Sequence, residues 1–274
     1  MFNGFYDEFF PGEPADRPEP PEDFLERAGK YAGAYGFWRS NFSTIEKALG
    51  LTSVLQVAPT PDNTLVVATS GGAKQYAEVG NNLFRELDPS IPLVAGIAPE
   101  YLAFQENEDG EITGFVLDGL PFMSLRRLPA AATPAFNFTM LGLSLLVFLA
   151  VVAGRWYQRS LVRSRTAPDS AAINSAFFAS AANLLVVITG VIVISIVQDA
   201  LFGGIPGLFK AWLVVPLIAA VLGLYLLYRT VLVWRDGLLA GTWARVRFTI
   251  VTLCALFMCW FYWYWNVLGF QYRT

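Results

Sequence analysis

The distribution of apolar residues changes at one point in the chain. Up to Pro129, apolar residues alternate with charged ones in short runs that are separated by turn-forming residues. After Pro134 they come in four long runs without a charged residue. About 20 apolar residues suffice for a helix to cross the hydrocarbon core of a bilayer. The pattern therefore predicts an α+β membrane protein in two parts, a β-rich domain and a helical membrane domain.

The first part predicts a small antiparallel β domain over residues 23–130. Its short runs are bounded by Gly, Pro, Asn and Asp, and Asp109-Gly110 predicts a tight hairpin turn. Seven or eight such runs indicate a small barrel, lipocalin-like, or a sandwich. The expected strands are residues 31–38, 53–58, 64–69, 75–79, 83–87, 102–106, 112–117 and 122–127.

Other local signals mark the edges of this domain. Residues 1–22 are aromatic and acidic and then rich in proline, which predicts an extended linker. Residues 23–30 are expected to form a short helix. Ser43-Thr-Ile-Glu46 has the spacing of a capping box, so one or two helical turns are expected there as well.

The second part, residues 131–274, predicts a four-helix transmembrane bundle with spans at about 135–154, 175–197, 211–228 and 248–270. A buried helix of a soluble protein would show a polar face, and these runs show none. The absence of charges within the spans argues against a transporter. Asn183 and Asn266 are expected to form hydrogen bonds between helices. The aromatic run 260–265 predicts an interfacial belt; the alternative is a face that binds a quinone or a lipid.

The two parts carry opposite charge. Residues 1–129 contain 19 acidic and 9 basic residues, and residues 130–274 contain 3 acidic and 10 basic ones. The acidic first part argues against nucleic acid as a partner. Arginine-rich loops stay in the cytoplasm, so loops 155–165 and 229–247 are predicted to be cytoplasmic. The β domain and the C-terminus are then extracytoplasmic, with the helices in an inner or plasma membrane.

An extracytoplasmic domain of this length usually needs a signal sequence, and none precedes the linker. Either the orientation is inverted or the sequence is the C-terminal part of a longer precursor. Because both basic loops agree, the second alternative is expected.

The composition restricts the chemistry. There is no histidine, which excludes catalysis by Ser-His-Asp and metal sites built on histidine. Cys254 and Cys259 lie in an apolar run and are expected to be small buried hydrophobes. An active site would need a Ser-Lys pair or two carboxylates, and no spacing singles one out. We therefore predict no catalytic residue, no metal site and no cofactor, and the ligand-binding residues stay unknown.

Four segments of the β domain carry a resemblance to a known family, and they are 24–35, 43–51, 76–85 and 102–110. The stretch 24–129 resembles the C-terminal β domain of membrane-anchored serine hydrolases of the β-lactamase/penicillin-binding-protein-like family. In that family a catalytic domain comes first, followed by a proline-rich link, this β domain and transmembrane helices. Residues 5–11 and the proline run look like the exit from such a catalytic domain.

The catalytic motifs of that family are absent from this sequence. The family uses a nucleophilic Ser in Ser-x-x-Lys and a Lys-Thr-Gly-type strand. None of Lys30, Lys47, Lys74 and Lys210 has a serine three residues before it, and none is followed by Thr-Gly or Ser-Gly. The resemblance thus implies a non-catalytic module that accompanies a hydrolase domain in cis or in trans.

Two functional hypotheses follow. In the first, the chain is an accessory β domain and membrane anchor of such a hydrolase in the cell envelope, and an exposed apolar patch around residues 1–37 is expected. In the second, it is a stand-alone binding or sensor subunit whose barrel takes a small ligand or whose β domain binds a protein. Six aromatic residues either line that pocket or fill a core, namely Tyr35, Phe37, Trp38, Phe84, Phe104 and Phe115.

Overall fold

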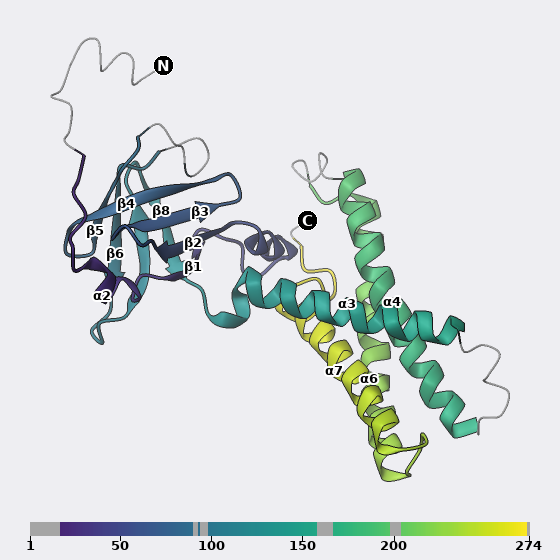
Figure 1. Cartoon of the computed structure of the whole chain (residues 1–274). Helices are drawn as coiled ribbons and strands as arrows, with labels where there is room; N and C mark the ends of the chain where they lie inside the picture. The colour runs from purple at the N-terminus through teal and green to yellow at the C-terminus, as the bar shows by residue number, and fades with distance from the viewer. Residues whose placement is uncertain (1–16, 90–92, 94–97, 158–166, 198–203, 273–274) are drawn as a thin grey trace. The chain divides into compact units, whose positions relative to one another are not determined.

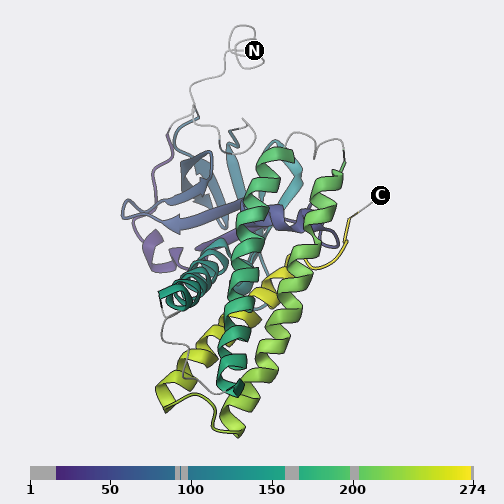
Figure 2. The same cartoon turned by 90° about the vertical axis from the view of Figure 1, so that its right-hand side faces the viewer.

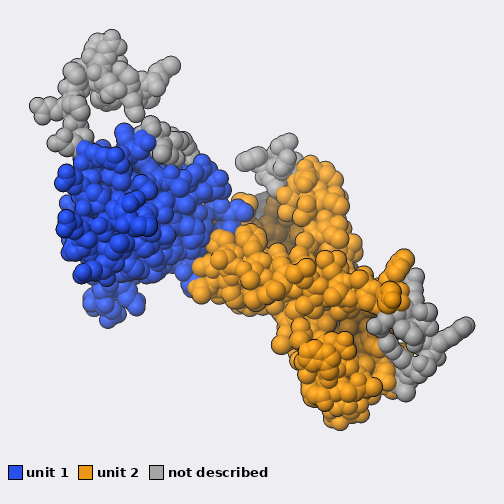
Figure 3. All heavy atoms as spheres, in the orientation of Figure 1, with its two compact units in different colours: residues 1–40, 50–129 blue, residues 41–49, 130–274 orange. Residues whose placement is uncertain are grey.

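A computed structural model describes residues 17–89, 93, 98–157, 167–197 and 204–272. The chain divides into two compact units (Figure 3). Unit 1 comprises residues 1–40 and 50–129, and unit 2 comprises residues 41–49 and 130–274. Residues 1–16 and the arginines at 159, 163 and 165 lie outside the described residues.

Unit 1 is a closed antiparallel barrel in which each strand pairs with its neighbours in sequence and β8 pairs with β1 (Figure 1). Of the two expected architectures, the barrel is confirmed. All eight expected strands form, because short runs joined by tight turns favour antiparallel neighbours. The strands are β1 (Gly33–Phe37), β2 (Val54–Pro59), β3 (Leu65–Thr69), β4 (Gly72–Gly80), β5 (Leu83–Glu86), β6 (Tyr101–Glu106), β7 (Ile112–Leu117) and β8 (Leu120–Arg127).

The β6–β7 turn forms at the predicted Asp-Gly. Gly110 has φ of 80°, a conformation that glycine adopts readily. The side-chain oxygen of Asn107 accepts the backbone N–H groups of Asp109 at 3.1 Å and of Glu111 at 2.8 Å. These bonds satisfy the turn amides and set the register of the hairpin.

The closure of the barrel depends on a close approach at Gly114 in β7. A Cβ atom at this position would lie 2.1 Å from the carbonyl oxygen of Leu125 in β8. No side chain fits in that space, so glycine lets the two backbones come together just before the register shift between Phe115 and Leu117.

Two short helical segments form before β2 in the sequence. Helix α2 (Phe24–Ala28) lies within the expected 23–30, and its Phe24 and Ala28 join the buried core. The Ser43–Glu46 signal overlaps the start of η1 (Ile45–Leu51), which is a 3₁₀ helix. The Glu46 carboxylate accepts a hydrogen bond from the Thr44 hydroxyl at 2.8 Å.

Unit 2 contains four helical spans that are long and apolar enough to cross a membrane, as predicted. They are α3 (Pro134–Tyr157), α4 (Ala167–Val197), the pair α5 (Gly207–Trp212) and α6 (Val214–Arg235), and α7 (Thr242–Tyr264). Helices α4 and α6 run side by side (Figure 2). The described chain is therefore a membrane protein in two parts.

The helix ends differ from the uncharged runs. Helix α4 begins at Ala167 rather than at 175, since Pro168 and Asp169 suit a first helical turn. Between α5 and α6, Pro216 cannot donate to the carbonyl of Trp212, which accounts for the break. Helix α7 ends at Tyr264 rather than at 270, because Asn266 adopts φ of 56° and ends the helix.

Segment 41–49 belongs to unit 2 although it lies between two barrel strands in sequence. The side-chain amide of Asn266 donates to the carbonyl oxygens of Phe42 and Thr44, both at 3.0 Å. The backbone N–H of Ile45 donates to the carbonyl of Gln271 at 2.8 Å. Asn266 thus joins the C-terminal turn to this segment, whereas an interhelical bond was expected.

Candidate functional site

The barrel interior is filled by aromatic side chains. Of the six aromatic residues with two proposed roles, Tyr35, Phe84, Phe104 and Phe115 are buried in one core cluster. The ring centroid of Phe104 lies 5.3 Å from that of Phe84 and 4.9 Å from that of Phe115. Phe37 packs partly against this cluster. The geometry is that of a packed core, as in small barrels whose lumen is occupied by side chains.

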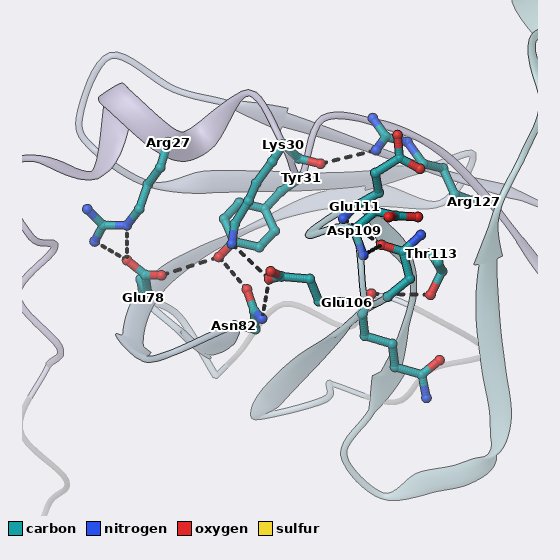
Figure 4. A network of polar contacts seen from close by, with 12 residues as sticks. Arg27, Lys30, Tyr31, Glu78, Asn82, Glu106, Asp109, Glu111, Thr113 and Arg127 are labelled. Carbon is teal, nitrogen blue, oxygen red and sulfur yellow. Dashed lines mark hydrogen bonds and ion pairs between the residues drawn. The ribbon is translucent and has the colours of Figure 1, made fainter.

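A polar network closes the barrel beside α2 (Figure 4). The Arg27 guanidinium pairs with the Glu78 carboxylate, whose side chain is 8% exposed. The Tyr31 hydroxyl donates to the side-chain oxygen of Asn82 at 2.7 Å. The Asn82 amide donates to the Glu106 carboxylate at 2.8 Å, and the Lys30 ammonium group lies 3.0 Å from the same carboxylate.

The charges of this network neutralise one another. Hydrogen bonds from Asn82 and Lys30 hold the pKa of Glu106 below its ordinary value. Burial raises the pKa of the Tyr31 hydroxyl, so the phenol stays protonated and donates. A general base needs a pKa near the working pH and access to a substrate. A carboxylate that is held ionised by two donors is instead suited to a structural role, in which it links the neighbouring segments of the barrel.

A second ion pair lies inside the barrel. Lys74 in β4 and Glu86 in β5 pair with side-chain exposures of 0% and 8%. The Lys74 ammonium group lies 6.0 Å from the centre of the Tyr76 ring, and the Tyr76 hydroxyl donates to the carbonyl of Pro99 at 3.0 Å. Burial lowers the pKa of Lys74. Strand β4 thus turns Lys74, Tyr76 and Glu78 inward, which sequence analysis missed.

The outer surface of the barrel carries an aromatic patch. We call Trp38, Arg39, Phe122 and Arg126 the Trp38–Phe122 patch. Trp38 is 56% exposed and Phe122 is 60% exposed. The Arg39 guanidinium lies 5.9 Å from the centre of the Phe122 ring, and that of Arg126 lies 5.5 Å from the Trp38 ring. Trp38 was expected with the core or pocket residues; it lies one residue beyond β1 and points outward.

Polar side chains join the helices of unit 2. The Tyr262 hydroxyl of α7 donates to the side-chain oxygen of Asn183 in α4 at 2.9 Å, so the expected interhelical bond of Asn183 is confirmed. The hydroxyls of Thr230 in α6 and Thr252 in α7 lie 2.6 Å apart. These contacts are buried and paired, and they are typical of bonds that hold membrane helices together.

Within unit 2, a groove of about 650 Å³ lies among α3, α4 and α7. Apolar side chains form most of its walls, among them Val151, Phe177 and Val251. Arg155 and Arg247 also line it, near the end of α3 and the beginning of α7. This groove combines an apolar wall with two cationic groups, and no pattern in the sequence analysis singled it out.

Reactive and metal-binding groups are sparse in the described part of the chain. Among the described residues, no three His, Cys, Asp or Glu side chains are placed to hold a metal ion. Cys254 and Cys259 are both free thiols on α7. The thiol of Cys259 lies 3.7 Å from the carbonyl oxygen of Ala220 in α6, and both cysteines are half-buried rather than fully buried as expected.

No protein-family model, curated protein or solved structure matches this chain. The fold and the two surfaces described above therefore carry the functional argument.

Proposed function

We propose that the chain is a non-catalytic, membrane-anchored β-barrel module whose outer surface binds a protein partner. The observation that carries this proposal is the filled interior. Tyr35, Phe84, Phe104 and Phe115 occupy the centre of the barrel, and α2 packs its Phe24 into the same core. A barrel that is filled by its own side chains has no room for a small ligand, so it binds through its outer surface.

The Trp38–Phe122 patch is the proposed binding surface. Tryptophan and arginine are enriched among the residues that contribute most to protein–protein binding. Trp38 is anchored to the barrel, because its backbone N–H donates to the carbonyl of Ser124 at 2.9 Å. A rigid strand end that presents exposed rings beside arginines loses little conformational entropy on binding.

The proposed partner is the catalytic domain of a serine hydrolase of the β-lactamase/penicillin-binding-protein-like family, in cis or in trans. The sequence resemblance supports this choice, and so does the lack of a Ser-x-x-Lys motif in the chain itself. The module would hold that domain near its substrates, which by resemblance are peptides of the peptidoglycan type. Substrate binding and catalysis would belong to the partner.

Photo-crosslinking tests this binding surface. p-Benzoylphenylalanine is placed at Phe122 in the full chain in native membranes, and a second variant carries it at Glu108, an exposed position in the β6–β7 turn. We expect a crosslink to a protein with a Ser-x-x-Lys motif from Phe122 and none from Glu108. Crosslinks of equal yield from both positions, or a partner without that motif, would contradict the proposal.

The proposed orientation places the barrel outside the cytoplasm. Arg155 lies in the last turn of α3, Arg235 ends α6, and Arg245 lies near the start of α7, so these arginines are next to the loops that are predicted to be cytoplasmic. Single cysteines at Glu108 and Thr242, in a background with Cys254 and Cys259 replaced by Ala, test this orientation. A membrane-impermeant maleimide added to intact cells should label only the first position. Labelling of the second position alone would invert the topology.

A further inference from the structure

The groove among α3, α4 and α7 has the composition of a lipid site. Val151 of α3, Phe177 of α4 and Val251 of α7 give it apolar walls. Its volume of about 650 Å³ is within the range of small-molecule sites. The arginines that line it introduce positive charge beside these walls, so the groove offers different chemistry to the two ends of an amphipathic molecule.

Both arginines lie at the depth of the lipid headgroups. The 20 residues that precede Arg155, 135–154, contain no charge. The 23 residues that follow Arg247, 248–270, contain none either. A charged side chain that directly flanks an uncharged span lies at the membrane–water interface. Arg155 and Arg247 therefore lie where phosphate groups of the bilayer are found.

The arginines keep their charge available for an anion. Among the described residues, neither Arg155 nor Arg247 forms an ion pair with a carboxylate. Arg155 donates to the side-chain oxygen of Asn174 at 2.9 Å, which fixes one edge of its guanidinium. Asp169 also lines the groove, and its carboxylate accepts the backbone N–H of Leu239 at 2.8 Å. Two arginines against one aspartate leave the groove with a net positive charge.

We propose that this groove binds an acidic phospholipid of the bilayer. The phosphate lies between Arg155 and Arg247, whose guanidinium groups suit phosphate oxygens. An acyl chain lies along the apolar walls of α3, α4 and α7. The net positive charge favours a lipid with an anionic headgroup over a zwitterionic one. The apolar walls favour a lipid over free phosphate, because only the lipid buries hydrocarbon there.

The test measures lipid retained by the full chain, delipidated in detergent and then incubated with phosphatidylglycerol or phosphatidylcholine. Native mass spectrometry counts the lipids that stay bound. We expect phosphatidylglycerol to bind in preference, and each of Arg155→Gln and Arg247→Gln to weaken its binding about fivefold, as removing one arginine from an anionic surface does. Arg235→Gln is the matched control, since this exposed arginine pairs with Asp236 and does not line the groove.

A second variant tests the apolar part of the groove without changing charge. Ala150 lines the groove and is exposed, so Ala150→Phe fills the space and leaves the helix intact. Loss of phosphatidylglycerol from this variant, with no displacement by excess inorganic phosphate, supports a lipid site. Displacement by phosphate alone, or equal losses from Arg235→Gln and Arg247→Gln, would overturn the proposal. Circular dichroism verifies that each variant keeps its helices.

Discussion

The buried pair of Lys74 and Glu86 offers the sharpest test of the barrel. The perturbation is Lys74→Met, which keeps a long flexible side chain but removes the charge. Glu86 is then left as an unpaired carboxylate whose side chain is only 8% exposed. Removing one partner of a buried ion pair costs about 3–5 kcal/mol of unfolding free energy, because the remaining charge loses its counter-ion without regaining water.

The double variant Lys74→Met/Glu86→Leu should recover most of that loss. Two apolar side chains of similar volume need no desolvation of charge, so replacing a buried pair is often neutral or stabilising. We expect the double variant to lie within about 1 kcal/mol of the original chain or above it. The difference between the single and double variants measures how strongly the pair is coupled.

The assay is hydrogen exchange of the full chain in detergent, followed by mass spectrometry of peptides from β4 and β5. A loss of about 4 kcal/mol of unfolding free energy raises the exchange rate of the protected amides about a thousandfold. Lys30→Met is the control, since its pair with Glu106 is partly exposed, at 32% and 33%, and should matter far less. Equal effects of Lys74→Met and Lys30→Met would refute the reasoning.

Three further predictions concern other parts of the chain. Gly114→Ala should destabilise the barrel by about 3 kcal/mol, because its Cβ would lie 2.1 Å from a β8 carbonyl oxygen; Gly80→Ala, whose Cβ would have 3.7 Å to its nearest neighbour, should fold normally in the same exchange assay. Tyr262→Phe should lower the melting temperature of unit 2 by removing the bond to Asn183, worth about 0.6–1.7 kcal/mol; an unchanged helical melting curve would contradict this. Because the pKa of Glu106 is held below its ordinary value in the folded barrel, the carboxylate stabilises the fold at neutral pH, and this stabilisation is lost as the pH falls through the folded-state pKa. Glu106→Gln should therefore flatten the decline in stability that an acid titration measures.

The strands were predictable because their signals are local. Alternating apolar residues predict the strands, and turn residues such as Asp109-Gly110 predict the hairpins between them. The sequence could not decide between a barrel and a sandwich, because a closed barrel depends on the pairing of β1 with β8, which are far apart in the sequence. Gly36 and Arg126 are partners in that pairing and lie far apart in sequence. No pattern within either strand specifies the other as its neighbour.

The helical spans were also predictable, from length and lack of charge, but their ends were not. Helix α4 continues through Pro168 and Asp169 because a proline in the first turn costs no hydrogen bond. Counting uncharged residues alone places the start too late. At the other end of the bundle, Asn266 stops α7 inside an apolar run, which hydrophobicity cannot indicate.

The candidate sites depend on contacts between distant residues. Lys74 and Glu86 form a pair only because β4 and β5 turn them to the same side of the barrel. Lys74, Tyr76 and Glu78 alternate along β4 and share one face, but two of the three are charged, so alternation alone predicts that this face points outward. Arg155 and Arg247 were recognised as topology signals, but the groove that they share requires three helices to be packed.

The membership of segment 41–49 in unit 2 has a consequence for synthesis of the protein on the ribosome. This segment emerges before seven of the eight barrel strands, yet it forms hydrogen bonds with Asn266 and Gln271, which follow all four spans in the sequence. The segment must therefore wait, without its partners, while the rest of the barrel and all four spans are produced. The contacts of this segment within unit 2 can therefore form only after Gln271 has been made, and separating the units at residue 130 would leave the turn after α7 without the segment it binds.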